Sequence, residues 1–277
     1  MPNSPPRGVP GIREVVVSRN DAADRRDLVA VEAPMEVRVN GASFAVIMRT
    51  PGADRDLAAG FLLAEDVIRT ADEIGTIEYC QDVTEEGRDN TINVTVTGDA
   101  VTRLAERLGD RRQVMMTSSC GLCGRRTIES LQARVAMVDG DWTVTPELIA
   151  SLPDRLRKSQ AVFESTGGLH AAGLFDRSGV LQLSAEDVGR HNAVDKIVGR
   201  TLLEGKHPLR QSILLVSGRT SFELVQKALL AGIPVLAAVS APSSLAIDLA
   251  EQASITLCGF VRGPQFNIYS HRRRIAD

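Results

Sequence analysis

Apolar residues in the first hundred positions alternate as in strands or recur with helical spacing. Residues 35–39 and 43–48 flank Asn40-Gly41, a dipeptide typical of tight turns, and therefore predict a β-hairpin. The apolar stripe that follows predicts a helix, capped by Asp54 and continuing to about Arg69. Two further strands and a short helix are expected over 77–80, 91–97 and 103–108. These elements indicate a small α+β unit.

From about residue 145 the pattern changes to strands that alternate with helices, which is typical of an α/β domain. Thr145 and Pro146 predict a helix start, with the threonine as cap and the proline in the first turn. Strands are expected over 169–175, 180–183, 213–216, 235–239 and 255–260, and helices over 190–203, 222–230 and 245–251. The later strands are continuous apolar runs, which indicates a parallel sheet covered on both faces.

The predicted fold class is therefore α/β in the second half and α+β for the whole chain. The domain bounds that follow are an N-terminal α+β domain over 12–112, a connecting segment over 113–144 and a C-terminal α/β domain over 145–277.

Composition and charge narrow the function classes. The 277 residues are 43% hydrophobic and 24% charged with a net charge of -3, ordinary values for a chain that can bury its own core. This balance gives no reason to expect nucleic acid or a membrane surface as a partner. The chain has no apolar stretch typical of a signal peptide or spanning helix, so we expect a cytoplasmic protein. Arg272-Arg273-Arg274 are expected to form a solvated end, or to contact phosphate or a partner's acidic surface.

Cys120 and Cys123 form a C-x-x-C motif in the most basic stretch of the chain, since residues 101–126 hold six arginines and two acidic residues. Glycines flank the motif and leave its backbone permissive, so the thiols would be presented rather than packed. Arginines stand close to it at positions 111, 112, 125 and 126. Their charge favours a thiolate, a nucleophile for disulfide, persulfide or metal chemistry. The alternative is a solvated loop with two idle thiols.

Zinc is disfavoured. A structural zinc site needs four ligands, but Cys80 and Cys258 are isolated in apolar strands, where we expect them in the core. The four histidines are scattered at positions 170, 191, 207 and 271. A zinc deaminase would need an H-x-E motif and a proline before the C-x-x-C, where this chain has Ser119. We expect no metal ligands.

Three turns in the second half are expected to bind anions: 217–221, 240–244 and 187–192. Each lies where a strand ends and a helix begins, so free backbone N–H groups face outward. Because strand ends of this kind gather at one edge of a sheet, the turns together favour a phosphate-bearing ligand. His170 and His191 have polar neighbours, although an isolated histidine is more often structural than functional.

Several long motifs closely resemble the FdhD family of formate dehydrogenase accessory sulfurtransferases. The motifs are MRTPGADRDLAAGFLLAED (48–66), SSCGLCG (118–124), TGGLHAAGLF (166–175), EDVGRHNAVDKIVG (186–199), SGRTSFELVQKALLAGIPVLAAVSAPSSLAIDLAE (217–251) and TLCGFVRGPQFNIYSH (256–271). The resemblance extends from about residue 12 to 275.

The resemblance implies a mechanism. A cysteine desulfurase would give sulfur to the C-x-x-C as a persulfide, with Cys120 as the bearer and Cys123 as its partner. The protein would bind the molybdenum cofactor bis-molybdopterin guanine dinucleotide as its substrate and sulfurate the metal. The cofactor would then enter formate dehydrogenase. The family's cofactor-binding stretch falls on Val261, Arg262, Gly263, Pro264, Gln265 and Phe266.

The resemblance also implies a homodimer and a C-terminal three-layer α/β/α domain similar to the cytidine deaminase fold. The diphosphates of that cofactor would give the anion-binding turns a purpose, so Ser217, Arg219 and His191 join the expected cofactor-binding residues. Two alternatives stay open. One is a thiol–disulfide redox module or sensor, and the other is a chaperone that escorts the cofactor without using its thiols.

Overall fold

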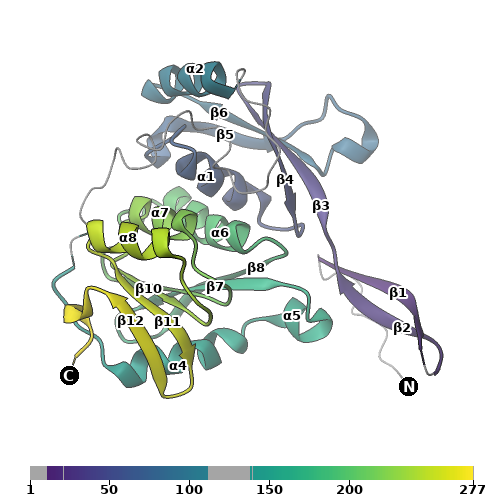
Figure 1. Cartoon of the computed structure of the whole chain (residues 1–277). Coiled ribbons are helices and arrows are strands. Elements are labelled where there is room, and N and C mark those ends of the chain that lie inside the picture. The colour runs from purple at the N-terminus through teal and green to yellow at the C-terminus, as the bar shows by residue number, and fades with distance from the viewer. Residues whose placement is uncertain (1–10, 21, 112–137, 139, 277) are drawn as a thin grey trace.

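The computed structural model describes residues 11–20, 22–111, 138 and 140–276 of the chain. These residues form a mixed α/β structure with sheets of two, four and six strands (Figure 1). The predicted fold class is confirmed. The proposed domain bounds remain a prediction, and most of the predicted connecting segment lies outside the described residues.

The four-stranded sheet has the order β4-β3-β6-β5. Its strands are β3 (Ala33–Val39), β4 (Ala42–Arg49), β5 (Ile74–Tyr79) and β6 (Thr91–Val96). The predicted hairpin joins β3 to β4, and Asn40 and Gly41 both have positive φ, as a tight hairpin turn requires. The Asn40 side chain accepts a hydrogen bond from the Val96 backbone N–H, which ties the turn to β6.

Helix α1 (Asp54–Ala64) follows this sheet and differs from its prediction at both ends. Asp54 is the first helical residue rather than the cap, and its carboxylate instead pairs with the buried Arg49 guanidinium at 2.7 Å. The helix ends at Ala64 rather than Arg69 because Asp66 adopts a left-handed conformation. The chain then turns Val67 and Ile68 into the core. Their apolar side chains had extended the predicted helical stripe too far.

Helix α2 (Asp99–Arg111) and the short helices η1 (Ala71–Glu73) and η2 (Glu85–Gly87) complete this part of the structure. A hairpin of β1 (Ile12–Arg19) and β2 (Ala22–Ala30) precedes the four-stranded sheet in the chain and projects from the rest of the structure (Figure 1). The pattern did not predict this hairpin, because the charged run Asp24–Asp27 hides the alternation of a strand.

The six-stranded sheet has the order β12-β11-β10-β9-β7-β8, with β9, β10 and β11 parallel. Its strands are β7 (His170–Asp176), β8 (Leu181–Asp187), β9 (Ser212–Val216), β10 (Val235–Ala238), β11 (Thr256–Arg262) and β12 (Gln265–Ser270). The helices are α4 (Pro146–Arg157), α5 (Ala161–Thr166), α6 (Arg190–Leu203), α7 (Phe222–Leu230) and α8 (Ser244–Gln252). Thr145 caps α4 as predicted, since its hydroxyl accepts the Leu148 N–H.

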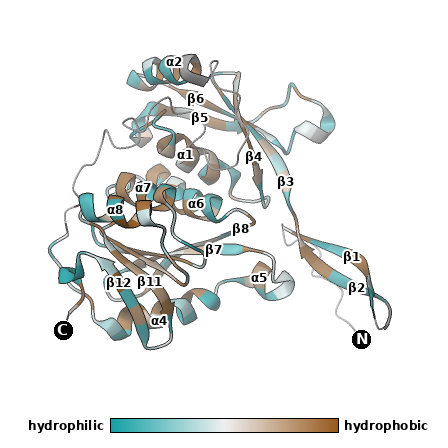
Figure 2. Ribbon diagram, viewed as in Figure 1, coloured by the Kyte–Doolittle hydropathy of each residue, from teal (hydrophilic) through white to brown (hydrophobic). Residues whose placement is uncertain are grey.

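Helices cover both faces of this sheet. In β9, Ile213 and Leu215 point toward α4, whereas Leu214 and Val216 point toward α6, α7 and α8. The hydrophobic residues accordingly concentrate on the central strands and on the helix faces turned toward them (Figure 2). The second half is therefore three-layered, as predicted. None of the helices in the described ranges is long and apolar enough to cross a membrane.

Helices α1 and α6 join the two larger sheets by packing closely against each other. Their backbones meet at Gly60 and Gly199. A Cβ atom at position 199 would overlap the Asp56 backbone oxygen, and one at position 60 would overlap that of Asp195. Only glycine allows this approach.

Replacing Gly199 with alanine is therefore expected to lower the free energy of unfolding by about 2 to 3 kcal/mol, because the two helices must separate. In an isolated helix the same change would instead stabilise by about 1 kcal/mol. Urea unfolding of Gly199→Ala measures the sign. Gly75→Ala is the control, since a Cβ there meets only ordinary contacts. A Gly199→Ala protein as stable as the wild type would contradict this view of the contact.

Of the three C-terminal arginines, Arg272 and Arg273 are exposed as expected, whereas Arg274 is buried. Arg274, in the short helix η4 (Arg272–Arg274), is 1% exposed. Its guanidinium donates to the backbone oxygens of Val138, Gly140 and Ser254 at 3.2, 2.9 and 2.6 Å. Arg274 therefore fixes the chain that enters α4 against the sheet. Charge alone could not distinguish it from its two exposed neighbours.

Candidate functional site

The three turns predicted to bind anions meet at one edge of the six-stranded sheet. Strands β9 and β10 end there, as does β8, whose Asp187 pairs with His170 at the start of β7. The turns at 217–221 and 240–244 are paired, because the Thr220 N–H donates to the Ala241 oxygen and the Ser243 N–H to the Thr220 oxygen. The common location inferred from the sequence is confirmed.

A cavity of about 590 Å³ opens at this edge, between α4, α5 and the strand ends. It brings His170 together with Ser217, one of the predicted cofactor-binding residues. Its lining consists of Pro153, Asp154, Arg157, Gln160, Phe163, Gly167, Gly168, Leu169, His170, Ser217 and Val239. The volume is that of a small-molecule site.

Helix α5 forms one wall of this cavity and is held from two sides. The Glu186 carboxylate accepts the backbone N–H groups of Val162 and Phe163 at 3.1 and 2.7 Å. The Arg157 guanidinium lies 4.3 Å from the centre of the Phe163 ring, within the range of a cation–π contact. Together these contacts place a cation and an aromatic face beside the strand ends.

Two histidines lie close to the turn at 217–221. Burial lowers the pKa of His170, and the nearby Arg190 charge lowers it further. His191 lies 3.0 Å from the Ser221 hydroxyl through Nε2, and burial, aided by the Lys227 charge, lowers its pKa to about 3. Both histidines are therefore neutral at physiological pH unless an anion binds beside them.

Asp187 is the centre of an internal network rather than an open binding group. Its Oδ2 accepts the Lys196 ammonium at 2.7 Å and the Thr50 N–H at 3.1 Å. Its Oδ1 accepts the Asn192 amide and the Gly189 N–H, both at 2.8 Å. This network ties the turn at 187–192 to the segment after β4.

The other predicted residues differ in their surroundings. Val261 is fully buried in the core and Phe266 packs against that core. Gly263 and Pro264 form an exposed turn, and Gln265, the first residue of β12, is also exposed. The Arg262 Nε donates to the Val239 oxygen at 2.9 Å, at the rim of the cavity. Arg219 is exposed.

Cys120 and Cys123 lie outside the described residues. Cys258 is in the core as expected, and burial raises its pKa to about 12. Cys80 is only partly buried, contrary to the expectation of a core position, and burial raises its pKa as well. Neither thiol is set up as a nucleophile. Within the described part of the chain, no group of three or more His, Cys, Asp or Glu side chains could hold a metal ion.

Sequence reasoning missed the wall made by α4 and α5. It included Arg190 in the turn at 187–192 but did not single it out as a site residue. Helix α5 has only six residues, too few for a periodic pattern to reveal it. Arg157 and Phe163 come together only through the fold, so no spacing in the sequence indicates their contact.

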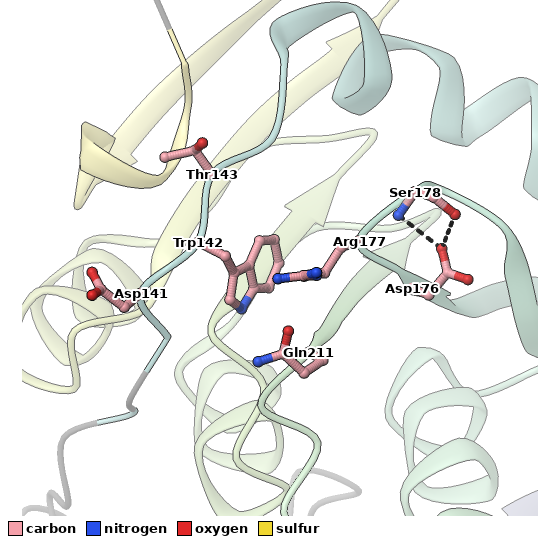
Figure 3. Close-up of a pocket in the computed structure, with 7 residues that line it drawn as sticks. All are labelled: Asp141, Trp142, Thr143, Asp176, Arg177, Ser178 and Gln211. Carbon is pink, nitrogen blue, oxygen red and sulfur yellow. Dashed lines mark hydrogen bonds between the residues drawn. The ribbon is translucent and has the colours of Figure 1, made fainter.

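A second cavity, of about 750 Å³, lies at the opposite edge of the sheet (Figure 3). Asp141, Trp142 and Thr143 line one side, and Asp176, Arg177, Ser178 and Gln211 the other. The Trp142 indole donates to the Arg210 oxygen, and Asp176 caps its own turn through Ser178. None of the predicted site residues lines it. The cavity of about 590 Å³ is therefore the candidate site, because it is lined by the predicted site residue Ser217 together with His170 and Arg157.

Similarity to known proteins extends along nearly the whole chain. Residues 30–276 match the FdhD/NarQ family. The chain is 51% identical to the sulfur carrier protein FdhD of Streptomyces avermitilis, over 95% of each chain. It is 49% identical to the protein of the same name from Nocardia farcinica, over 91% of this chain and 89% of that one. The fold is similar to a candidate formate dehydrogenase accessory protein from Desulfotalea psychrophila, with a TM-score of 0.73 at 26% identity, covering 96% and 98% of the two chains.

Proposed function

The chain belongs to the FdhD/NarQ family, and from this premise we propose that it is a sulfur carrier for the maturation of a formate dehydrogenase. It takes sulfur from a cysteine desulfurase as a persulfide on Cys120, with Cys123 as the second thiol of the motif. It then passes the outer sulfur atom to the metal of bis-molybdopterin guanine dinucleotide, its substrate. In this step the S–S bond breaks, Cys120 leaves as a thiolate, and the metal supplies the two electrons that reduce the sulfur to a sulfide ligand. The protein acts in the cytoplasm as a homodimer.

One observation carries this proposal: the C-x-x-C motif belongs to a chain that matches sulfur carrier proteins over 95% of its length. A carrier thiol must be a thiolate to accept sulfur, and the flanking arginines favour that form. The raised pKa values of Cys80 and Cys258 leave the motif as the source of reactive thiols.

The side chains at the edge of the six-stranded sheet support this choice of substrate. A guanine dinucleotide carries flat rings and diphosphates. The cavity there is lined by Phe163 and by Arg157, whose guanidinium stacks on that ring and also pairs with Glu164 at 3.2 Å. His170 and Ser217 line the same cavity, and Arg262 stands at its rim. This combination supports a nucleotide-bearing ligand rather than an apolar one.

Incubation with a cysteine desulfurase and L-cysteine tests the proposal directly. Intact-protein mass spectrometry is expected to show the mass of one added sulfur atom, and peptide mapping to place it on Cys120. The thiol–disulfide alternative predicts the loss of two hydrogens between Cys120 and Cys123 without added sulfur. That second result, in the presence of an active desulfurase, would exclude the sulfur carrier.

A further inference from the structure

The His170 imidazole and the Arg190 guanidinium flank Gly218, in the turn that joins β9 to α7. A Cβ atom at position 218 would lie 3.4 Å from Nδ1 of His170 and 3.5 Å from Cδ of Arg190. Because glycine has no side chain, this backbone stays open between the imidazole and the guanidinium. Ser217, the residue before it, lines the cavity together with His170.

Arg190 has no acceptor for a buried donor. Its Nε atom is inaccessible to solvent and has no hydrogen-bond partner among the described residues. Of the neighbouring carboxylates, Asp187 pairs with Lys196. Glu223 lies 3.3 Å from Lys227 through Oε1, whereas its Oε2 is buried without a hydrogen-bond partner among the described residues and lies 3.5 Å from His191 Nε2. Buried donors without partners are rare in folded proteins, and each calls for a ligand, an ion or a water.

Thr220, in the same turn, repeats this situation. Its side chain is 1% exposed and its hydroxyl oxygen has no hydrogen-bond partner in the described ranges. One unsatisfied group therefore comes from the start of α6 and the other from the Gly218 turn itself. They are independent of the sequence pattern that first suggested the turn.

Two helices, α6 and α7, begin beside this turn, and neither N-terminus has a side-chain cap. The N-cap residues are Gly189 for α6, a helix of 14 residues, and Ser221 for α7, a helix of 9 residues. The Ser221 hydroxyl contacts His191 instead of its own helix. The neighbouring α8 differs, because its cap Ser243 accepts the Ala246 N–H. The first-turn amides of α6 and α7 thus add the positive ends of two helix dipoles to the guanidinium and the imidazole.

From these contacts we propose that Arg190, His170 and the Gly218 turn form a subsite for a phosphate or diphosphate group. Its ligand is an oxyanion with several acceptor oxygens, because the donors converge from a guanidinium, an imidazole and backbone amides. The other arginines of this edge are placed less well, since Arg219 is exposed and Arg262 is bonded to the Val239 oxygen. The inference deepens the proposed function and rests on it for the identity of the whole ligand.

Inorganic pyrophosphate is the probe, titrated into the full chain by calorimetry at constant ionic strength and pH. The wild type is expected to bind it, and Arg190→Gln and His170→Gln each to weaken the affinity at least tenfold. Gly218→Ala keeps every charge but fills the turn, and is expected to weaken binding severalfold. Circular dichroism and thermal unfolding show that each variant is folded.

The control is Arg177→Gln, which removes the same charge from an exposed arginine at the opposite edge of the sheet. Its affinity is expected to equal that of the wild type. A wild type that does not bind pyrophosphate, or an Arg177→Gln variant weakened as much as Arg190→Gln, overturns the subsite.

A Cys120→Ala variant separates the two proposals, since it should bind pyrophosphate as the wild type does. If it binds and still matures formate dehydrogenase, the subsite stands and the sulfur carrier fails. If Cys120→Ala does not mature formate dehydrogenase, and neither the wild type nor any variant binds pyrophosphate, the sulfur carrier stands and the subsite fails.

Discussion

Replacing Cys120 with alanine is expected to abolish the maturation of formate dehydrogenase, with a loss of at least a hundredfold in the activity of the client enzyme. The reason is chemical: without its Sγ atom, position 120 cannot hold the outer sulfur of a persulfide. A thiol at another place in the chain is a poor substitute, because the pKa values of Cys80 and Cys258 are raised and little thiolate forms near pH 7. The measurement is formate oxidation in extracts of cells whose own carrier gene has been deleted and which express one of the variants instead.

The matched control is Cys80→Ala, which removes a partly buried thiol outside the motif and should leave maturation unchanged. Cys120→Ala should also unfold at the same temperature as the wild type, so that lost activity reflects lost chemistry. Full formate dehydrogenase activity with Cys120→Ala would mean that the protein escorts the cofactor without carrying sulfur.

The hydrophobic pattern predicted best those helices whose ends are determined by neighbouring residues in the sequence. The bounds of α6 and α7 are those expected, because each follows a turn and has a clear apolar stripe. Tertiary contacts explain the errors. Asp54 looked like a helix cap, but the buried Arg49 takes its carboxylate. Ile68 looked helical, but a left-handed Asp66 ends the turn first.

The site divides in the same way. Strand ends and glycine turns can be located from sequence, and their meeting at one sheet edge follows from parallel topology. The wall made by Arg157 and Phe163 could not be predicted, because its contact joins two short elements through the fold. Arg190 was hidden for another reason. Its significance lies in a missing partner, which no sequence can display.

The segment 186–199 shows how one motif can serve two purposes. Arg190 faces the proposed subsite, whereas Asp187 and Lys196 point inward and join the two halves of the protein. The Lys196 ammonium also donates to the Thr50 backbone oxygen at 2.9 Å, and the Asn192 amide to that of Met48 at 2.8 Å. These hydrogen bonds of Asp187, Asn192 and Lys196 hold the turn after β4 against the start of α6.

Asp187→Ala is accordingly expected to lower the free energy of unfolding by about 3 to 5 kcal/mol, because it leaves the buried Lys196 charge without its counter-ion. It also removes the acceptor of the Thr50 and Gly189 N–H groups. Urea unfolding measures the loss. Asp248→Ala, which removes an exposed carboxylate from α8, should change the stability little.

A double-mutant cycle then separates the ion pair from the remaining contacts of Asp187. If the unpaired charge causes the loss, adding Lys196→Met to Asp187→Ala should recover stability, since no charge is left buried. Losses that simply add would instead assign the effect to the Thr50 and Gly189 hydrogen bonds. Recovery in the double mutant, together with unchanged pyrophosphate affinity, would establish that the inward residues of this motif support the subsite without contacting its ligand.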